Sequence, residues 1–311
     1  MEVFEIIKQS DDFKYFANAK NMPHSILLFS KDEQYSLELA KLLAIQILDG
    51  KVDSESEVFK KVMLFSHPDV KYYPSKNQLL VADSEEIVSE SFVKPIFSNS
   101  KVFIIKNIDN SMESAQNKLL KTLEEPSKDA YLILTCFNPA LVLPTIKSRC
   151  AKRDLAKLSD KQIESVLGNE NPLAIKLADG GLGKAISLSQ KPDLDEIFAL
   201  ALDIMTKMKS SKEVLSYSKR MQKFSKDFQL IVECMSLILE DLLKLKTGGK
   251  IRLEMFGEEL KKASEGYSIK ALTKINGKIN DEQKEVFYNV NQLIAMENLL
   301  LNILEVKYIC K

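Results

Sequence analysis

The sequence predicts an α/β domain with a mostly parallel sheet at the N-terminal end, followed by a helical remainder. Three short apolar runs, Ser25–Phe29, Val102–Ile105 and Tyr131–Thr135, have the composition of strands covered on both faces. Helical patterns lie between these runs, and such alternation is typical of a parallel sheet. From Leu155 onward the apolar residues recur at helical spacing.

The composition sets limits on the number of domains and on the class of partner. A chain of 311 residues exceeds the usual size of one domain, so two or three domains are expected. Hydrophobic residues make up 45% of the sequence, which is enough to bury sizeable cores. Lys plus Arg and Asp plus Glu both number 44, so the formal net charge is zero. Such a chain has no overall attraction to nucleic acid or to an anionic membrane, which disfavours a DNA-binding module acting alone.

The cysteines indicate a reducing compartment. The four of them, at positions 136, 150, 234 and 310, have neither the spacing of a zinc site nor that of a disulfide framework. No apolar run is long enough to span a bilayer, and the acidic start of the chain does not resemble a signal peptide. The sequence therefore predicts a soluble, cytoplasmic protein without a bound metal.

The loop after the first strand stands where a phosphate-binding loop would be, between that strand and a helix predicted over Leu37–Leu48. A phosphate loop needs glycines for close backbone approach, a lysine for the β- and γ-phosphates and a hydroxyl for magnesium. The segment Ser30–Ser36 contains no glycine, and Leu37 and Glu38 stand near the positions of the lysine and the hydroxyl. Lys31, Leu37 and Glu38 therefore mark a degenerate loop.

The charge of this loop supports the same prediction. Asp32, Glu33 and Glu38 place negative charge at the start of the helix. The helix dipole and the free backbone N–H groups would otherwise favour a phosphate at this end. We therefore expect no ATP to bind here.

Residues 101–150 carry the most specific patterns. Asn110 followed by Glu113 predicts the start of a helix close to a capping box, and Pro126 predicts its end. After the next strand, a stretch punctuated by prolines leads to the triplet Ser148-Arg149-Cys150.

The strings Asn117–Pro126 (NKLLKTLEEP) and Thr145–Cys150 (TIKSRC) occur in this order between matching strands. They resemble the clamp-loader branch of the AAA+ ATPases. The resemblance implies an AAA+ α/β domain with a P-loop-type parallel sheet over residues 1–155. It also implies a small helical lid over residues 156–192 and an all-α collar domain for ring assembly over residues 193–311.

Other nucleotide-binding parts of that family are replaced as well. Active members carry an Asp-Glu pair after the strand Val102–Ile105, with one carboxylate on magnesium and the other orienting water. This chain has Lys106 and Asn107 there, and in the lid Gly183 or Lys184 stands where active members place an arginine sensor. The lysine, the hydroxyl and both carboxylates are missing, which predicts a pseudo-ATPase without a nucleotide cofactor.

Arg149 is retained although those parts are lost. A guanidinium is a planar, permanently charged fork suited to phosphate oxygens. The resemblance places Arg149 at a subunit edge, as an arginine finger that reaches the ATP of the neighbouring subunit. Ser148 would orient the turn and Cys150 would pack beneath it. The alternative for Arg149 is a surface ion pair with a carboxylate such as Asp154.

Two further features receive a structural interpretation. Glu124 and Glu125 could act as paired acid–base carboxylates, but the solvated end of a helix before Pro126 is favoured. The family resemblance adds that they could face a neighbour or DNA. His67, in a His-Pro-Asp segment similar to one in the family, is interpreted as a turn residue, because neither it nor His24 has a ligand cluster around it.

The function implied by the resemblance is that of a non-ATPase subunit of the bacterial DNA polymerase III clamp loader. Such a subunit completes the ring that loads the sliding clamp on primed DNA. Its partners would be the gamma/tau and delta subunits and, indirectly, the clamp and the DNA, with no membrane and no small-molecule substrate. The alternatives are an ATP-hydrolysing gamma/tau-type subunit, against which the segment Lys31–Glu38 argues, and a stand-alone DNA-binding scaffold.

Overall fold

The computed structural model describes residues 3–74, 77–168, 171–285 and 292–310. The chain divides into two compact units. The first consists of Met1–Asn169 with Gly180–Ile186, and the second of Glu170–Asp179 with Ser187–Lys311. The chain therefore passes from one unit to the other three times.

The first unit is built on a five-stranded parallel sheet with the order β2-β3-β4-β1-β5. β1 (Ser25–Phe29) pairs with both β4 and β5, so that Leu27 lies opposite Leu134 on one side and Lys152 on the other. The carboxyl ends of parallel strands meet at one edge of the sheet, where ligands bind in folds of this kind. The other strands are β2 (Val70–Tyr73), β3 (Lys101–Ile105), β4 (Ala130–Cys136) and β5 (Ala151–Asp154).

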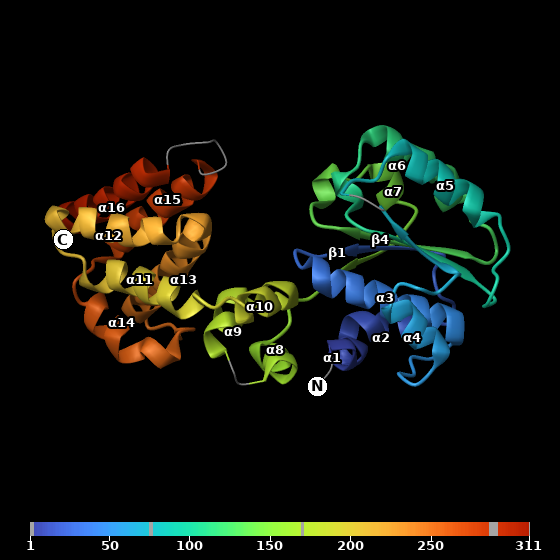
Figure 1. Cartoon of the computed structure of the whole chain (residues 1–311), viewed down its shortest axis with the longest axis horizontal. Coiled ribbons are helices and arrows are strands. Elements are labelled where there is room, and N and C mark those ends of the chain that lie inside the picture. Colours follow the sequence, from blue (N-terminus) through green and yellow to red (C-terminus); the bar gives the residue numbers. More distant parts are fainter. Residues whose placement is uncertain (1–2, 75–76, 169–170, 286–291, 311) are drawn as a thin grey trace. The chain divides into compact units, whose positions relative to one another are not determined.

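Helices cover both faces of this sheet (Figure 1). The central strands are buried as a result, and Phe103 and Ile104 of β3 are 0% exposed. This double cover explains the continuous apolar runs in the sequence. On one face lie α1 (Val3–Gln9), α2 (Asp11–Ala17), α3 (Glu33–Asp49) and α4 (Glu57–Met63), and on the other α5 (Val81–Ser91), α6 (Glu113–Glu124) and α7 (Pro144–Lys147).

The predicted α/β class with a P-loop-type parallel sheet is confirmed. β1 has the predicted bounds, and β3 and β4 extend the predicted strands by one or two residues. The two edge strands, β2 and β5, were not predicted. Each has only four residues, and β5 reads Ala-Lys-Arg-Asp with alternating half-buried and exposed side chains.

The predicted start of α6 at an Asn110 cap is wrong. Asn110 lies in a 3-10 helix, Ile108–Asn110, and α6 begins at Glu113 with Met112 as its N-cap. Because Asn110 is part of this 3-10 helix, it does not cap α6. Its side chain donates to the backbone oxygen of Asn77. The helix was predicted to end after Glu125, before Pro126; α6 ends one residue earlier, at Glu124, and Glu125 is its C-cap.

The His-Pro-Asp segment anchors a loop that comes much later in the chain. The fully buried Asp69 carboxylate accepts the backbone N–H groups of Ile96, Phe97 and Ser98 at 2.6–2.7 Å. Burial opposes ionisation of Asp69, yet these three donors outweigh it and lower its pKa below the usual range. His67 accepts from the Asp69 N–H through Nδ1, and its carbonyl accepts the Val70 N–H, which confirms a turn residue.

The second unit is helical in its described residues. An apolar stripe along its long central helix is fully buried, and each of its five residues is 0% exposed: Ile231, Cys234, Met235, Ile238 and Leu242. The helices are α9 (Pro172–Ala178), α11 (Leu194–Lys207), α12 (Ser211–Lys223), α13 (Phe228–Thr247), α14 (Gly257–Ser264), α15 (Ile269–Glu285) and α16 (Gln292–Ile309). None of the described helices is long and apolar enough to cross a bilayer.

The predicted lid, residues 156–192, contains three helices that belong to different units. α8 (Asp160–Leu167), capped by Ser159, and the first turns of α10 (Leu182–Ser189) belong to the first unit. α9, capped by Asn171, belongs to the second. The division at residues 155/156 and 192/193 stays a prediction.

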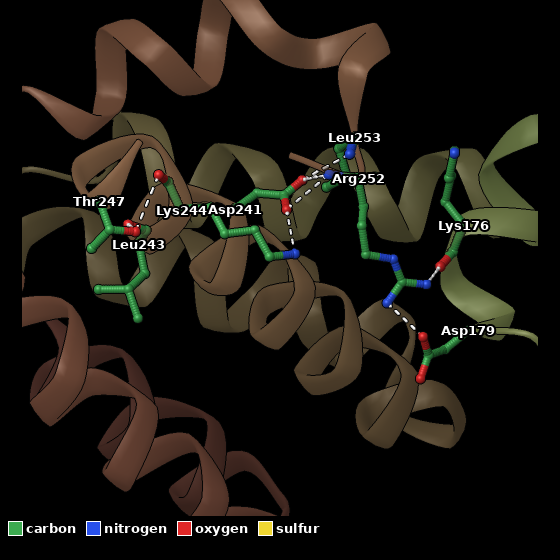
Figure 2. Close-up of polar contacts among 8 residues, drawn as sticks. All are labelled: Lys176, Asp179, Asp241, Leu243, Lys244, Thr247, Arg252 and Leu253. Atoms are coloured by element: carbon green, nitrogen blue, oxygen red, sulfur yellow. Dashed lines mark hydrogen bonds and ion pairs between the residues drawn. The ribbon is translucent and has the colours of Figure 1, made fainter. Parts of the chain in front are cut away.

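A buried carboxylate in α13 attaches α9 to the second unit (Figure 2). Asp241, 0% exposed, accepts the backbone N–H groups of Arg252 and Leu253 at 2.7–3.0 Å and pairs with Lys244 at 3.3 Å. The Arg252 guanidinium then donates to the carbonyl of Lys176 at 2.5 Å and pairs with Asp179 at 2.9 Å. A cation at the C-terminal end of a helix is electrostatically favourable, so Arg252 stabilises the end of α9.

We expect Asp241→Ala to lower the free energy of unfolding of the full chain by about 3 kcal/mol, because it leaves two backbone donors without their buried acceptor. Urea denaturation followed by circular dichroism measures this change. Thr247→Ala is the matched control on the same helix: its exposed hydroxyl bonds only to Leu243 and Lys244 carbonyls, so a change within about 0.5 kcal/mol is expected. Equal effects of the two substitutions would contradict the anchoring role of Asp241.

Candidate functional site

The loop after β1, Ser30–Ser36, which the sequence predicts to be a degenerate phosphate loop, is organised by Asp32. This residue is the N-cap of α3, and its Oδ1 accepts the Tyr35 N–H at 3.1 Å. The same carboxylate accepts the N–H groups of Leu182 and, at 3.2 Å, of Gly183 in the first turn of α10. The N–H groups at helix N-termini are the donors that bind phosphates. In this chain one carboxylate uses them on two helices.

Gly183 lies against this loop too closely for any side chain. A Cβ added there would stand 2.9 Å from the Gln34 Cβ and 3.1 Å from Asp32 Oδ1. The sequence placed Gly183 or Lys184 where active relatives carry an arginine sensor. Gly183 leaves no room for such a side chain, and Lys184 is exposed.

Lys31, Leu37 and Glu38, which predicted a degenerate loop, lie in different environments. Lys31 is exposed and Leu37 is half-buried. Glu38 is buried in α3, where it pairs with Lys41 at 2.6 Å and accepts from Gln34 Nε2 at 3.0 Å. A carboxylate paired in this way offers magnesium no hydroxyl and adds no positive charge for a phosphate.

A second polar contact, between Tyr35 and Asp12, holds the start of α3, and it was not predicted from the sequence. Tyr35, 3% exposed, donates its hydroxyl to Asp12 Oδ2 at 3.1 Å. Asp12, 2% exposed, also accepts from Arg153 Nε at 2.7 Å and from the Ala156 N–H at 3.1 Å. Burial, more than any other cause, raises the pKa of Tyr35, which keeps the phenol protonated as a donor. The start of α3 is thereby joined to α2 and β5.

The end of β3 carries no carboxylate pair for a metal. The Lys106 N–H donates to the Tyr73 carbonyl at 2.7 Å, and the N–H of Asn107, a left-handed residue with φ 50°, donates to Thr135 Oγ1 at 3.0 Å. Asp109 accepts the N–H groups of Phe137 and Asn138, so its carboxylate joins two loops. Among the described residues no three His, Cys, Asp or Glu side chains gather as a metal site.

Arg149 lies at the end of the short helix α7 with its side chain 31% exposed. Nη1 donates to the Thr145 carbonyl at 2.9 Å and to Ser148 Oγ at 3.3 Å. Nη2 pairs with Glu124, the last residue of α6. An ion pair therefore forms, but Glu124 and not the suggested Asp154 is the partner.

The flanking residues of the triplet have supporting positions. Ser148 Oγ donates to the Thr145 carbonyl at 3.0 Å, which fixes the turn. Cys150 is buried, and burial raises the pKa of its thiol to about 12. A thiol of this kind is a packing residue, as predicted, because a reactive cysteine needs a stabilised thiolate.

We expect Asp32→Ala to lower the free energy of unfolding by about 2 kcal/mol, the sum of a lost helix cap and lost charge-assisted bonds to α10. Hydrogen exchange of the Tyr35, Leu182 and Gly183 amides should accelerate together in the full chain. Glu33→Ala removes the same charge from the exposed neighbouring residue and should leave the Leu182 and Gly183 amides protected. Equal exchange in the two variants would mean that Asp32 does not hold α10.

The chain matches DNA polymerase III subunits in sequence. Residues 7–159 match the family described as DNA polymerase III, delta subunit. A DNA polymerase III delta' subunit from Bacillus subtilis is 25% identical over 302 residues, covering 91% of this chain and 92% of that protein. A DNA polymerase III gamma subunit from Buchnera aphidicola is 26% identical over 267 residues, covering 73% and 72%.

The fold is similar to that of a solved structure, a protein related to the DNA polymerase III gamma subunit. A DNA polymerase III gamma subunit-related protein from Thermotoga maritima aligns over 98% of both chains with a TM-score of 0.50 and 16% identity. This likeness concerns the fold alone. In sequence, the chain is similar to a DNA polymerase III delta' subunit over nine tenths of its length, and nearly half of it matches the DNA polymerase III delta subunit family.

Proposed function

We propose that this chain is the delta'-type, non-ATPase subunit of a cytoplasmic DNA polymerase III clamp loader. In this role it completes a ring with gamma/tau and delta subunits, and the ring loads the sliding clamp on primed DNA. The observation that carries the proposal is the use of the α3 and α10 N-terminal donors by Asp32. These are the donors that a bound triphosphate would need.

The electrostatics of the loop support the non-ATPase part of the proposal. Asp32 puts a negative charge at the helix N-termini, and a polyphosphate placed beside it would be repelled. Neither Leu37 nor the paired Glu38 supplies a compensating cation. An ATP-hydrolysing gamma/tau-type subunit is the second candidate, because a gamma subunit matches over 73% of the chain.

The role of Arg149 follows from its chemistry and its exposure. A guanidinium at the subunit surface can stabilise the charge that develops on the phosphates of an ATP bound by a neighbour. Arginine fingers supplied in this way raise rates by about 10³–10⁵ in GTPases. Arg149 would act in trans, so that the chain takes part in hydrolysis without a nucleotide of its own.

We expect calorimetry of the isolated full chain to show no saturable binding of magnesium-ATP at physiological concentrations. The physical reason is the lack of a phosphate-binding lysine together with the Asp32 charge. A gamma-type subunit titrated in the same way is the positive control. Tight, magnesium-dependent binding to this chain would support the gamma/tau-type candidate instead.

We expect Arg149→Ala to reduce the clamp- and DNA-stimulated ATPase kcat of a reconstituted loader by at least about 10-fold, since it removes charge stabilisation at the neighbouring phosphates. Arg149→Lys should restore little of the loss, because an ammonium lacks the planar fork. Gel filtration must show that each variant still assembles into the ring. Unchanged ATPase in an intact ring would leave the subunit a scaffold.

A further inference from the structure

Three acceptors hold the Arg149 guanidinium before any partner is present. The Thr145 carbonyl and Ser148 Oγ bind Nη1, and the Glu124 carboxylate binds Nη2. Nε is buried without a hydrogen-bond partner, so these three contacts are the ones that hold the guanidinium. Two of the acceptors come from α7 and the residue after it, but Glu124 comes from α6, 25 residues earlier.

Glu124 is well placed for this contact. It is the last residue of α6, and the chain turns away at Pro126, so the carboxylate stands at a fixed helix end. α6 and α7 pack against each other, which sets the distance between Glu124 and the turn that carries Arg149. The sequence interpretation of Glu124 as a solvated helix end is therefore incomplete, because the side chain is 47% exposed but has a partner.

The contact contributes little to stability and much to orientation. Ion pairs as exposed as this one stabilise a fold only slightly, because water screens them and both side chains lose freedom. An arginine finger, however, acts only when its guanidinium is in the right place, and a free arginine side chain samples many rotamers. Fixing the guanidinium in advance removes that cost from the step in which the neighbour's ATP is bound.

The contact also leaves the guanidinium able to act. A guanidinium has five N–H donors, and the three contacts occupy three of them. With the Nε hydrogen buried, a second Nη2 hydrogen is available to a phosphate oxygen. Glu124 can therefore stay in place while Arg149 donates to the phosphate.

We propose that Glu124 is the positioning residue of Arg149: it orients the guanidinium toward a nucleoside triphosphate bound by the neighbouring subunit. This inference rests on the proposed function, in which Arg149 acts in trans. Glu124 itself does not touch the nucleotide. It acts only through Arg149, and that restriction makes the inference testable.

The test is the clamp- and DNA-stimulated ATPase of the reconstituted loader with Glu124→Ala, Glu124→Gln or Glu125→Ala in this chain. Glu124→Ala should lower kcat about 3- to 10-fold while KM for ATP changes less than about 2-fold, because the finger acts mainly in the transition state. Glu124→Gln should keep most of the rate, since the amide oxygen accepts the same N–H. Glu125→Ala removes a charge from the exposed next residue and should change neither constant.

A double-mutant cycle separates this inference from the proposed function. In the Arg149→Ala background, Glu124→Ala should cause no further loss of kcat. A loss of the same size there would show that Glu124 acts independently and would overturn the inference. A rate that stays equal or rises with Glu124→Ala, while Arg149→Ala lowers it, would also overturn the inference and leave the proposed function standing. An unchanged rate with Arg149→Ala in an assembled ring would reject the finger itself.

A measurement on the free subunit supplies an independent readout. The Nη proton signals of Arg149 should show hindered rotation of the guanidinium in the native chain and in Glu124→Gln, and averaged signals in Glu124→Ala. Hindered rotation that persists in Glu124→Ala would mean that Thr145 and Ser148 suffice, and would overturn the inference. Glu124 is exposed, so these variants should fold, and circular dichroism checks that they do.

Discussion

One carboxylate that serves two helix N-termini is the constraint on which the loop after β1 depends. Asp32 starts α3 and holds the first turn of α10, which lies 150 residues further along the chain. Helix N-termini bind anions because their N–H groups have no partner within the helix. Here the anion is part of the chain, so no ligand is needed to bring the two helix ends together. The close packing of Gly183 against Gln34 follows from the same contact.

The polar groups at the two ends of α6 differ in how far contacts within the chain occupy them. Near its start, the Asp109 carboxylate accepts two backbone N–H groups from the loop after β4. Lys106 and Asn107, directly after β3, provide no carboxylate for a metal ion. At the other end of α6, Glu124 takes only part of the Arg149 guanidinium. The loops after β1 and β3 are thus closed by internal hydrogen bonds. Arg149, by contrast, stays partly exposed at the surface.

The sequence was sufficient for the elements with strong local signals. Buried strands such as β1 were predicted from apolar runs, and the helical character of the chain after Leu155 from the spacing of its apolar residues. The edge strand β5 was missed because its charged residues look like a loop, and the Asn110 cap failed because a 3-10 turn intervened. The site residues could be named from motifs. Their partners, Glu124 for Arg149 and Gly183 for Asp32, lie far away in sequence, and only the folded chain brings them together.

The threefold passage of the chain between its two units bears on how it can be divided. A cut at residue 192/193 looks natural from composition, but it would separate α9 from Arg252 and the buried Asp241 behind it. A cut before α8 would instead take the first turn of α10 away from Asp32. The second unit thus includes residues 170–179, which follow directly on the first unit in sequence, and the first unit includes residues 180–186, which come after them. Truncated forms of this protein have no single clean boundary, and a fragment intended to fold alone must be assembled from discontinuous segments.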